Sequence, residues 1–381
     1  MSQAIQFDPI RLPDAAEDLR SEVRAFLAEN SDHLDRPSRR GFDHEFSRKV
    51  AAKGWIGLTW PKEYGGQERS FLERYVITEE FLVARAPSQV YFTADRQSGP
   101  VILKYGDEAL KRDVLPRIIA GECTFAIGMS EPDSGSDLFA AKARAERTNE
   151  GWRLNGTKVW TTAAHEADYM IGLFRTSPPT KENRRHGLTQ FLVDMKKPGI
   201  NVRPIFWPNG DHDFNEVVFE DVDMPANHLL GEEDNAWAQA TAELAYERSG
   251  PERFLETIAV LIELVNLVGP SPDSRAAEGL GRLVAQLFTM RRMSISVAGM
   301  LAAGKEPVLE ASIVKDLGTV WMQKLPGICR DLGSLIDNDP AARSRFEMAL
   351  TSNLLIAPKL TIQGGTTEIL RGIIARGLGL R

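Results

Sequence analysis

Two short runs of small and aromatic residues carry the clearest chemical signal in this sequence. The first is a turn of serines with Pro132 and Gly135 at residues 130–137, and the second, residues 158–162, carries Trp160 and two threonines. Pro132 fixes one backbone angle and Gly135 permits close approach or a positive φ, while the serines offer hydroxyls and N–H groups. We expect the second run to be a β-type segment that presents one large ring. Small hydrogen-bond donors beside a flat aromatic side chain suit the binding of a flat heterocycle with polar edges.

Composition excludes several classes of protein. The 381 residues are 43% hydrophobic and 26% charged, which is typical of a globular protein of two or three domains. A net charge of -7 argues against nucleic-acid binding, which usually needs a basic face. No apolar run approaches the about 18 residues of a membrane span, and residues 1–13 lack the apolar core of a signal peptide. A cytoplasmic protein is the resulting expectation.

Cysteine and histidine usage predicts neither a metal centre nor a disulfide framework. Cys123 and Cys329 are the only cysteines, and neither belongs to a CxxC pair. The six histidines are scattered without metal-ligand spacing. We expect them to be surface or hydrogen-bonded side chains.

Hydrophobic periodicity predicts an α+β protein in three parts: residues 1–120 helical, 121–231 built of strands, and 232–381 a helical bundle. The expected helices are 15–29, 70–85, 236–267, 280–303, 307–332, 343–356 and a short one at 365–375. The expected strands include 169–174, 187–193 and 216–219, with a hairpin turn at Asn155-Gly156. Residues 177–186 are expected to form an exposed loop.

Four motifs occur in a fixed order along the chain, at residues 57–66, 130–137, 160–162 and 364–369. On these motifs the sequence resembles the acyl-CoA dehydrogenases, nearly from end to end. The resemblance implies that family's fold: a helical N-terminal domain, a small β domain and a C-terminal four-helix bundle. It also implies an FAD-dependent α,β-dehydrogenation of an acyl-CoA thioester. In that reaction a carboxylate removes the α-proton, donors hold the thioester oxygen, and the flavin accepts a hydride.

The position of the catalytic base departs from the commonest pattern of the family. Many members carry a glutamate before the Gly-Thr of the C-terminal loop, where this chain has Gly364. In the isovaleryl-CoA and long-chain branches the base lies on a bundle helix, just before an arginine, and Glu247 with Arg248 matches that pattern. The resemblance therefore implies Glu247 as base and a backbone N–H donor at Gly364. On residues alone, an ordinary exposed Glu-Arg pair on a helix is the more common situation and is favoured.

The resemblance also assigns the binding residues. It implies that Ser136 and Arg248 contact the acyl-CoA. Glu368 stands where the family often has glutamine, and an acid is unfavourable beside phosphates. The implied cofactor residues are Met129, Ser130, Gly135, Ser136, Trp160, Thr162, Thr366 and Glu368.

Two family motifs are missing. In homotetrameric members, a neighbouring subunit holds the adenosine half of FAD with an Arg-x-x-Phe-Gly run and a Gln-x-x-Gly-Gly-x-Gly run, and residues 269–280 and 331–340 contain neither. The chain thus resembles the base-bearing subunit of bacterial α2β2 acyl-CoA dehydrogenases that act on bulky thioesters, including sterol side chains. The expected partners are an acyl-CoA, a related subunit and an electron-transfer flavoprotein. Alternatives are divergent loops that bind the adenosine half differently, a catalytically silent structural or regulatory homologue, and an acyl-CoA oxidase.

Overall fold

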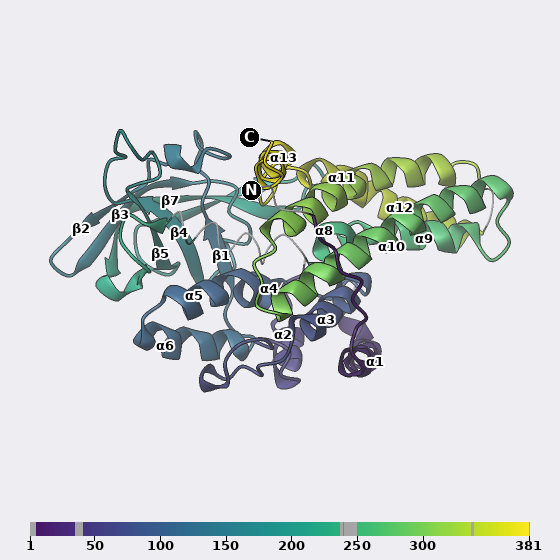
Figure 1. Ribbon diagram of the computed structural model, residues 1–381, viewed down its shortest axis with the longest axis horizontal. Coiled ribbons are helices and arrows are strands. Elements are labelled where there is room, and N and C mark those ends of the chain that lie inside the picture. The colour runs from purple at the N-terminus through teal and green to yellow at the C-terminus, as the bar shows by residue number, and fades with distance from the viewer. Residues whose placement is uncertain (1–4, 35–40, 237–238, 240–249, 337–338, 381) are drawn as a thin grey trace. The chain divides into compact units, whose positions relative to one another are not determined.

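The chain forms two compact units in the computed structural model, which describes residues 5–34, 41–236, 239, 250–336 and 339–380 (Figure 1). The helical unit comprises residues 1–29, 70–86 and 247–381, and the sheet unit comprises 30–69 and 87–246. Helices precede Ala120, strands lie between Phe125 and Leu230, and helices follow from Glu252. This order confirms the expected α+β class, while the domain limits at residues 120 and 231 stay predictions.

Eight strands of the described chain make one sheet in the sheet unit. Its order is β6-β7-β3-β2-β4-β5-β8, with β1 paired parallel to β4. Large apolar side chains fill its core, where the Trp152 ring lies edge-on to Phe191 at 5.2 Å between centroids. The strands are β1 (Phe125–Gly128), β2 (Arg144–Arg147), β3 (Gly151–Lys158), β4 (Tyr169–Arg175), β5 (Leu188–Asp194), β6 (Ile200–Phe206), β7 (His212–Pro225) and β8 (Leu229–Leu230).

The expected hairpin turn at Asn155-Gly156 is wrong. Both residues lie inside β3, where the pairing with β7 shifts register between Leu154 and Gly156. Gly156 has φ +134°, and a Cβ there would lie 2.6 Å from Ala143. A β-bulge therefore uses this glycine, because bulges and turns need the same backbone freedom. The chain reverses instead between β2 and β3, where the Thr148 N–H donates to the Gly151 carbonyl.

Short helices accompany the sheet in the same unit. Asp107 accepts from the Leu110 N–H at 2.7 Å and caps α6, two residues after the end of α5. Residues 177–186 form the expected loop. The α-helices are α2 (His44–Ala52), α4 (Gln89–Thr93), α5 (Gly99–Tyr105) and α6 (Glu108–Ile119), of which the last two pack against each other.

The helical unit is built on amphipathic helices. Leu19, Val23 and Phe26 bury one face of α1 (Asp14–Glu29), as their spacing predicts. Ser70 starts α3 (Phe71–Val83) with a capping box, in which the Ser70 N–H donates to Glu73 at 2.8 Å. The remaining helices are α8 (Glu252–Leu255), α9 (Ile258–Val268), α10 (Ser274–Ala302), α11 (Val308–Gly333), α12 (Pro340–Ile356) and α13 (Thr367–Gly377).

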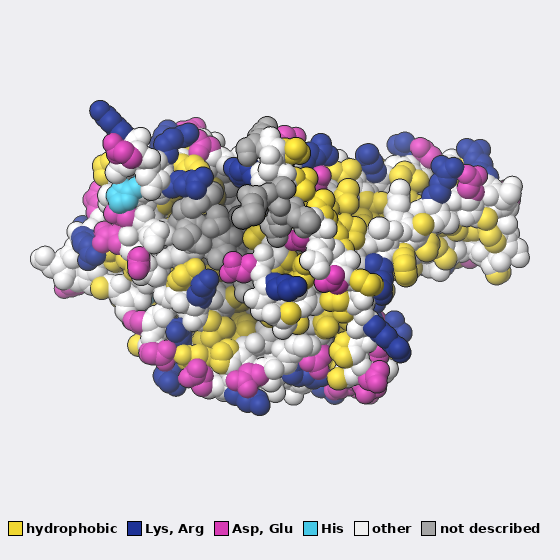
Figure 2. Space-filling view, viewed as in Figure 1, with side chains coloured by type: hydrophobic (Ala, Val, Ile, Leu, Met, Phe, Trp, Pro, Cys, Tyr) yellow, Lys and Arg dark blue, Asp and Glu magenta, His cyan; other side chains and the backbone are white. Residues whose placement is uncertain are grey.

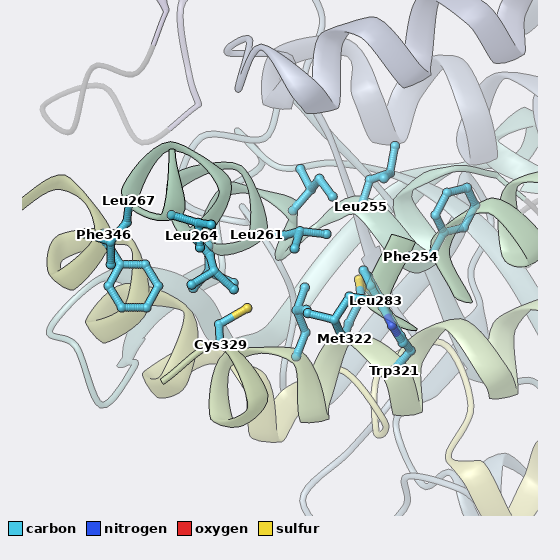
Figure 3. Packing of buried hydrophobic residues seen from close by; sticks show 14 of the residues in the cluster. Phe254, Leu255, Leu261, Leu264, Leu267, Leu283, Trp321, Met322, Cys329 and Phe346 are labelled. Atoms are coloured by element: carbon cyan, nitrogen blue, oxygen red, sulfur yellow. The ribbon is translucent and has the colours of Figure 1, made fainter. Parts of the chain in front are cut away.

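The long helices α9 to α12 run side by side and enclose an apolar core (Figure 1). Figure 3 shows part of that core, including Leu264 of α9 and Trp321, Met322 and Cys329 of α11. The expected helix 236–267 is not continuous in its described part, because it breaks between α8 and α9 at Glu256 and Thr257. In the part of the chain that the structure describes, no helix is long and apolar enough to cross a membrane.

Candidate active site

The Ser130–Asp137 loop leaves the end of β1 as a tight turn. Glu131 and Ser134 exchange backbone hydrogen bonds of 2.8 and 3.0 Å, and the Ser134 hydroxyl donates to the Asp137 carbonyl at 2.7 Å. Ser130 is half-buried, whereas Gly135 and Ser136 are exposed. The turn is therefore closed by its own backbone and leaves polar groups of Ser130 and Ser136 available.

Gly135 does not have the positive φ that was one of its two expected roles, and close approach of a ligand to it stays a prediction. Its φ is not positive, and a Cβ added there would meet nothing within 4 Å. The space above it is open. Met129, next to the loop, packs partly against Ala141 and Leu173.

Trp160 lies in a turn after β3 and not in a strand, which corrects the expected β-type segment. Trp160 has φ +58° and Ala163 has φ +60°, a left-handed conformation that is uncommon for residues with a Cβ. The Trp160 side chain is 58% exposed, and Thr162 is half-buried. Non-glycine residues in this conformation cluster at ligand-binding turns.

Asn215 of β7 holds this turn in place, a role that sequence analysis missed. The Thr161 N–H donates to the Asn215 carbonyl at 3.0 Å, and the Asn215 side-chain amide donates back to the Thr161 carbonyl at 3.0 Å. The same side chain lies between His165 and His212, whose rings stack at 3.8 Å. These residues border an open cavity of about 390 Å³. The described residues contain no group of three or more His, Cys, Asp or Glu that could hold a metal ion.

The serine loop and the tryptophan turn lie side by side. The Val159 N–H donates to the Ser130 carbonyl at 2.9 Å, one residue before Trp160. The structure thus brings together an exposed indole ring, serine hydroxyls and open space over Gly135. These features fit a flat ring system with polar edges, such as the flavin that the sequence predicts.

The C-terminal loop around Gly364 is a separate constellation in the helical unit. Gly364 and Gly365 have φ +63° and +99°, so the loop needs glycine at both positions. The buried Lys315 ammonium of α11 donates to the Gln363 carbonyl at 2.6 Å and to the Gly365 carbonyl at 2.9 Å. The first bond fixes the peptide that joins Gln363 to Gly364, and the second fixes the peptide that follows Gly365. A residue with a Cβ, such as the family's glutamate, would be strained at position 364.

Thr366 and Glu368 lie at the start of α13. Thr366 is the N-cap residue, and its hydroxyl accepts from the Ile369 N–H at 3.4 Å. Hydrogen bonds from the Glu368 backbone and the Thr366 hydroxyl lower the pKa of the Glu368 carboxyl. A helix N-terminus suits a phosphate, but the Glu368 carboxylate already occupies this one. Cofactor contact by Thr366 and Glu368 stays a prediction, as do the assignments of the other site residues.

Glu247 and Arg248, the expected base and its neighbour, lie outside the described residues. Gly250 is the next described residue, and Pro251 precedes the first turn of α8. The sequence match alone therefore supports these two assignments.

Comparison with known proteins agrees with this geometry. Residues 13–122 match the model for the acyl-CoA dehydrogenase N-terminal domain, and residues 126–222 match that for the middle domain. The chain is 32% identical over 386 residues to acyl-CoA dehydrogenase IpdE1 of Mycobacterium tuberculosis, covering 96% of this chain and 97% of the relative.

Two solved structures resemble the whole chain. One, the Tcur3481-Tcur3483 steroid ACAD, has a TM-score of 0.83 at 27% identity and covers 97% of this chain and 98% of its own. The other, the ChsE4-ChsE5 complex from Mycobacterium tuberculosis, has a TM-score of 0.80 at 27% identity and covers 99% of each. The chain therefore belongs to the acyl-CoA dehydrogenase family of FAD-dependent enzymes.

Proposed function

We propose that this chain is the base-bearing subunit of a heteromeric acyl-CoA dehydrogenase that acts on a bulky thioester. The observation that carries the catalytic half is the loop at Gly364. No carboxylate stands at this position, and its left-handed backbone would strain a glutamate there, which supports a base from elsewhere in the chain. Glu247, followed by Arg248, matches the alternative position in the family.

In the proposed mechanism, the Glu247 carboxylate accepts the α-proton of the acyl-CoA. The Gly364 N–H donates to the thioester oxygen, on which negative charge develops as that proton leaves. Through the Gln363 carbonyl, Lys315 holds the peptide that carries this N–H, and through the Gly365 carbonyl it holds the peptide that follows Gly365. Bound FAD supplies the hydride acceptor for the β-hydrogen, which no side chain can provide. Ser130, Ser136, Trp160 and Thr162 would hold its ring, and Ser136 and Arg248 would contact the substrate.

Replacing the carboxylate tests this mechanism directly. In Glu247→Gln the amide cannot take the α-proton, so substrate should no longer bleach the flavin absorbance, while FAD content stays unchanged. Bleaching at the wild-type rate would contradict the assignment and favour a catalytically silent role for this chain.

Comparing peroxide formation with reduction of an electron-transfer flavoprotein separates a dehydrogenase from an oxidase.

The proposal of a heteromeric assembly is based on the missing adenosine-binding run between the bundle helices. The connection between α9 and α10 is a short turn in which Asp273 caps α10, with none of the family's adenosine-binding arginine run. The bundle helices carry exposed hydrophobic side chains such as Val265, Phe288 and Met348, and Figure 2 displays hydrophobic side chains over this part of the surface. We propose that these side chains contribute to contact with another subunit, as contiguous exposed apolar surface does in other proteins. The two-component names of both structural relatives point the same way.

The number of FAD molecules bound per tetramer distinguishes a heteromeric assembly from a homotetramer of this chain. The chain should bind FAD poorly when purified alone, and should give two FAD per four subunits when co-expressed with a related subunit from its genomic neighbourhood. A fully flavinated homotetramer of the single chain would contradict the proposal. A panel of thioesters from short-chain to steroid-sized then defines the acyl group, and faster turnover of the bulky members is expected.

A further inference from the structure

A buried ion pair lies beneath the serine loop and the tryptophan turn. The Lys158 ammonium lies 2.7 Å from a Glu131 carboxylate oxygen, and the two side chains are 0% and 6% exposed. Lys158 ends β3 two residues before Trp160, and Glu131 follows Ser130 directly. Neither side chain has a role in the proposed mechanism.

Glu131 closes the serine loop with both carboxylate oxygens. One accepts from the Lys142 N–H at 2.6 Å, and the other accepts from the Ala143 N–H at 3.0 Å. The carboxylate oxygen that accepts from the Ala143 N–H also accepts a hydrogen bond from the Lys158 ammonium. Since the backbone of Glu131 pairs with Ser134, one residue ties the turn to the chain before β2 and to the end of β3.

Lys158 is fully buried, and the nearby Glu131 carboxylate favours the charged form of its ammonium. Burial lowers the pKa of its ammonium, and the Glu131 carboxylate opposes that shift. The ammonium also lies 5.1 Å from the centre of the Phe174 ring, a favourable cation–π position. The pair is therefore held from several sides, and loss of one partner would leave an uncompensated charge in the core.

Stability alone is a poor explanation for such a pair. Buried ion pairs are often no better for stability than neutral side chains of the same volume, because desolvation offsets the attraction. What this pair adds is a directed link of fixed length between the two segments. It works in parallel with the single backbone bond from Val159 to Ser130.

We propose that Glu131 and Lys158 are positioning residues that set the separation of Ser130 and Trp160, and through it the affinity and orientation of the flavin ring. This inference rests on the proposed assignment of Ser130 and Trp160 to the cofactor. Neither Glu131 nor Lys158 needs to touch cofactor or substrate for this role. Flavin binding should therefore respond to the pair even where folding does not.

The double variant E131Q/K158M tests the proposal in the FAD-containing assembly. It removes both charges while nearly keeping side-chain volume, so no unpaired buried charge remains. We expect the FAD dissociation constant of the apo-assembly to rise by roughly tenfold or more, as for other supporting residues of binding sites. The visible circular dichroism of the bound flavin should change. The melting temperature of the apo-assembly should fall somewhat, because the amide of E131Q can accept from only one of the Lys142 and Ala143 N–H groups.

A matched control is available on the same strand. Arg153 of β3 pairs with Asp223 of β7 at 2.9 Å, with side chains 45% and 68% exposed. The variant R153M/D223N removes an ion pair of the same sheet and should leave FAD affinity and dichroism unchanged. Wild-type values for both quantities in E131Q/K158M would overturn the proposal.

Two further variants keep the test decisive. Glu131→Asp retains the charge but shortens the side chain, and it serves as the test if E131Q/K158M does not fold. It should weaken FAD binding, and unchanged binding would equally overturn the proposal. Trp160→Ala checks the premise. If it leaves FAD binding intact, the cofactor assignment itself fails and this inference with it. If it weakens binding while the ion-pair variants do not, only the positioning role is refuted.

Discussion

At the scale of single residues, the proposed mechanism relies on a backbone N–H at Gly364 and not on a side chain there. Gly364 stands where many relatives carry glutamate, and its φ of +63° would strain any residue with a Cβ. The peptide N–H survives this replacement. Its direction depends on neighbouring peptides, which Lys315 holds through the carbonyls of Gln363 and Gly365.

Lys315→Met should therefore damage catalysis more than cofactor binding. Without the ammonium, the Gly364 loop loses two hydrogen bonds, and its N–H no longer points reliably at the developing oxyanion. We expect kcat to fall by roughly tenfold or more, since a well-placed donor of this kind contributes about 100-fold or more. Steady-state kinetics with the preferred thioester measures the loss. Lys324→Met, on an exposed position of α11, is the control, and an unchanged kcat in Lys315→Met would refute the role.

At the scale of elements, some of the local expectations hold and others fail for a physical reason. Apolar spacing predicts α1, α3 and the long bundle helices, because a buried stripe repeats along each of them. The Asn155-Gly156 pair predicts a turn, yet the same positive φ serves a β-bulge. Local sequence does not distinguish the two, since the partner strand β7 lies more than 50 residues away.

The junction of α8 and α9 carries an ion pair that should make the helical unit sensitive to acid. Burial raises the pKa of Glu256, but the Lys359 ammonium at 2.7 Å and the Gln363 amide outweigh it and hold the pKa below its usual value. A carboxyl with a lowered pKa in the folded state stabilises the fold above its ordinary pKa near 4.5. That contribution disappears as the pH falls through the folded-state pKa.

Lys359→Met should remove this dependence. We expect it to lower the free energy of unfolding at neutral pH by about 1 kcal/mol, since the pair is partly exposed. The difference from wild type should shrink as the pH falls from about 6 to about 3, because Glu256 becomes protonated in both proteins. Thermal melts of both proteins across this pH range measure the difference in stability. A difference that stays constant with pH would show that the ion pair is not its cause.

At the scale of the whole molecule, sequence predicted the order of helices, strands and helices, and the structure places the segments of Ser130 and Trp160 side by side. Sequence did not reveal the side chains that support these segments. Lys158 is 27 residues from Glu131, Asn215 is 54 from Thr161, and Lys315 is 48 from Gln363. Such pairs have no periodicity or motif spacing, because only the folded chain brings them together.

The two cysteines offer a separate measure of each compact unit. Cys123 belongs to the sheet unit and Cys329 to the core of the bundle, where Figure 3 shows it among apolar side chains. Both are fully buried, and burial raises the pKa of each thiol to about 12. Because the thiolate is the reactive form, neither should react with a thiol reagent in the native protein at about pH 8.

Pulse labelling across a denaturant series, followed by peptide mapping, should then detect each thiol only where its own unit opens. Labelling of Cys123 reports the sheet unit, and labelling of Cys329 reports the bundle, without any substitution in the chain. In the co-expressed assembly, added FAD should shift the labelling of Cys123 to higher denaturant, because a ligand that binds only the folded state stabilises it. Rapid, complete labelling of either thiol without denaturant would contradict the burial on which this prediction depends.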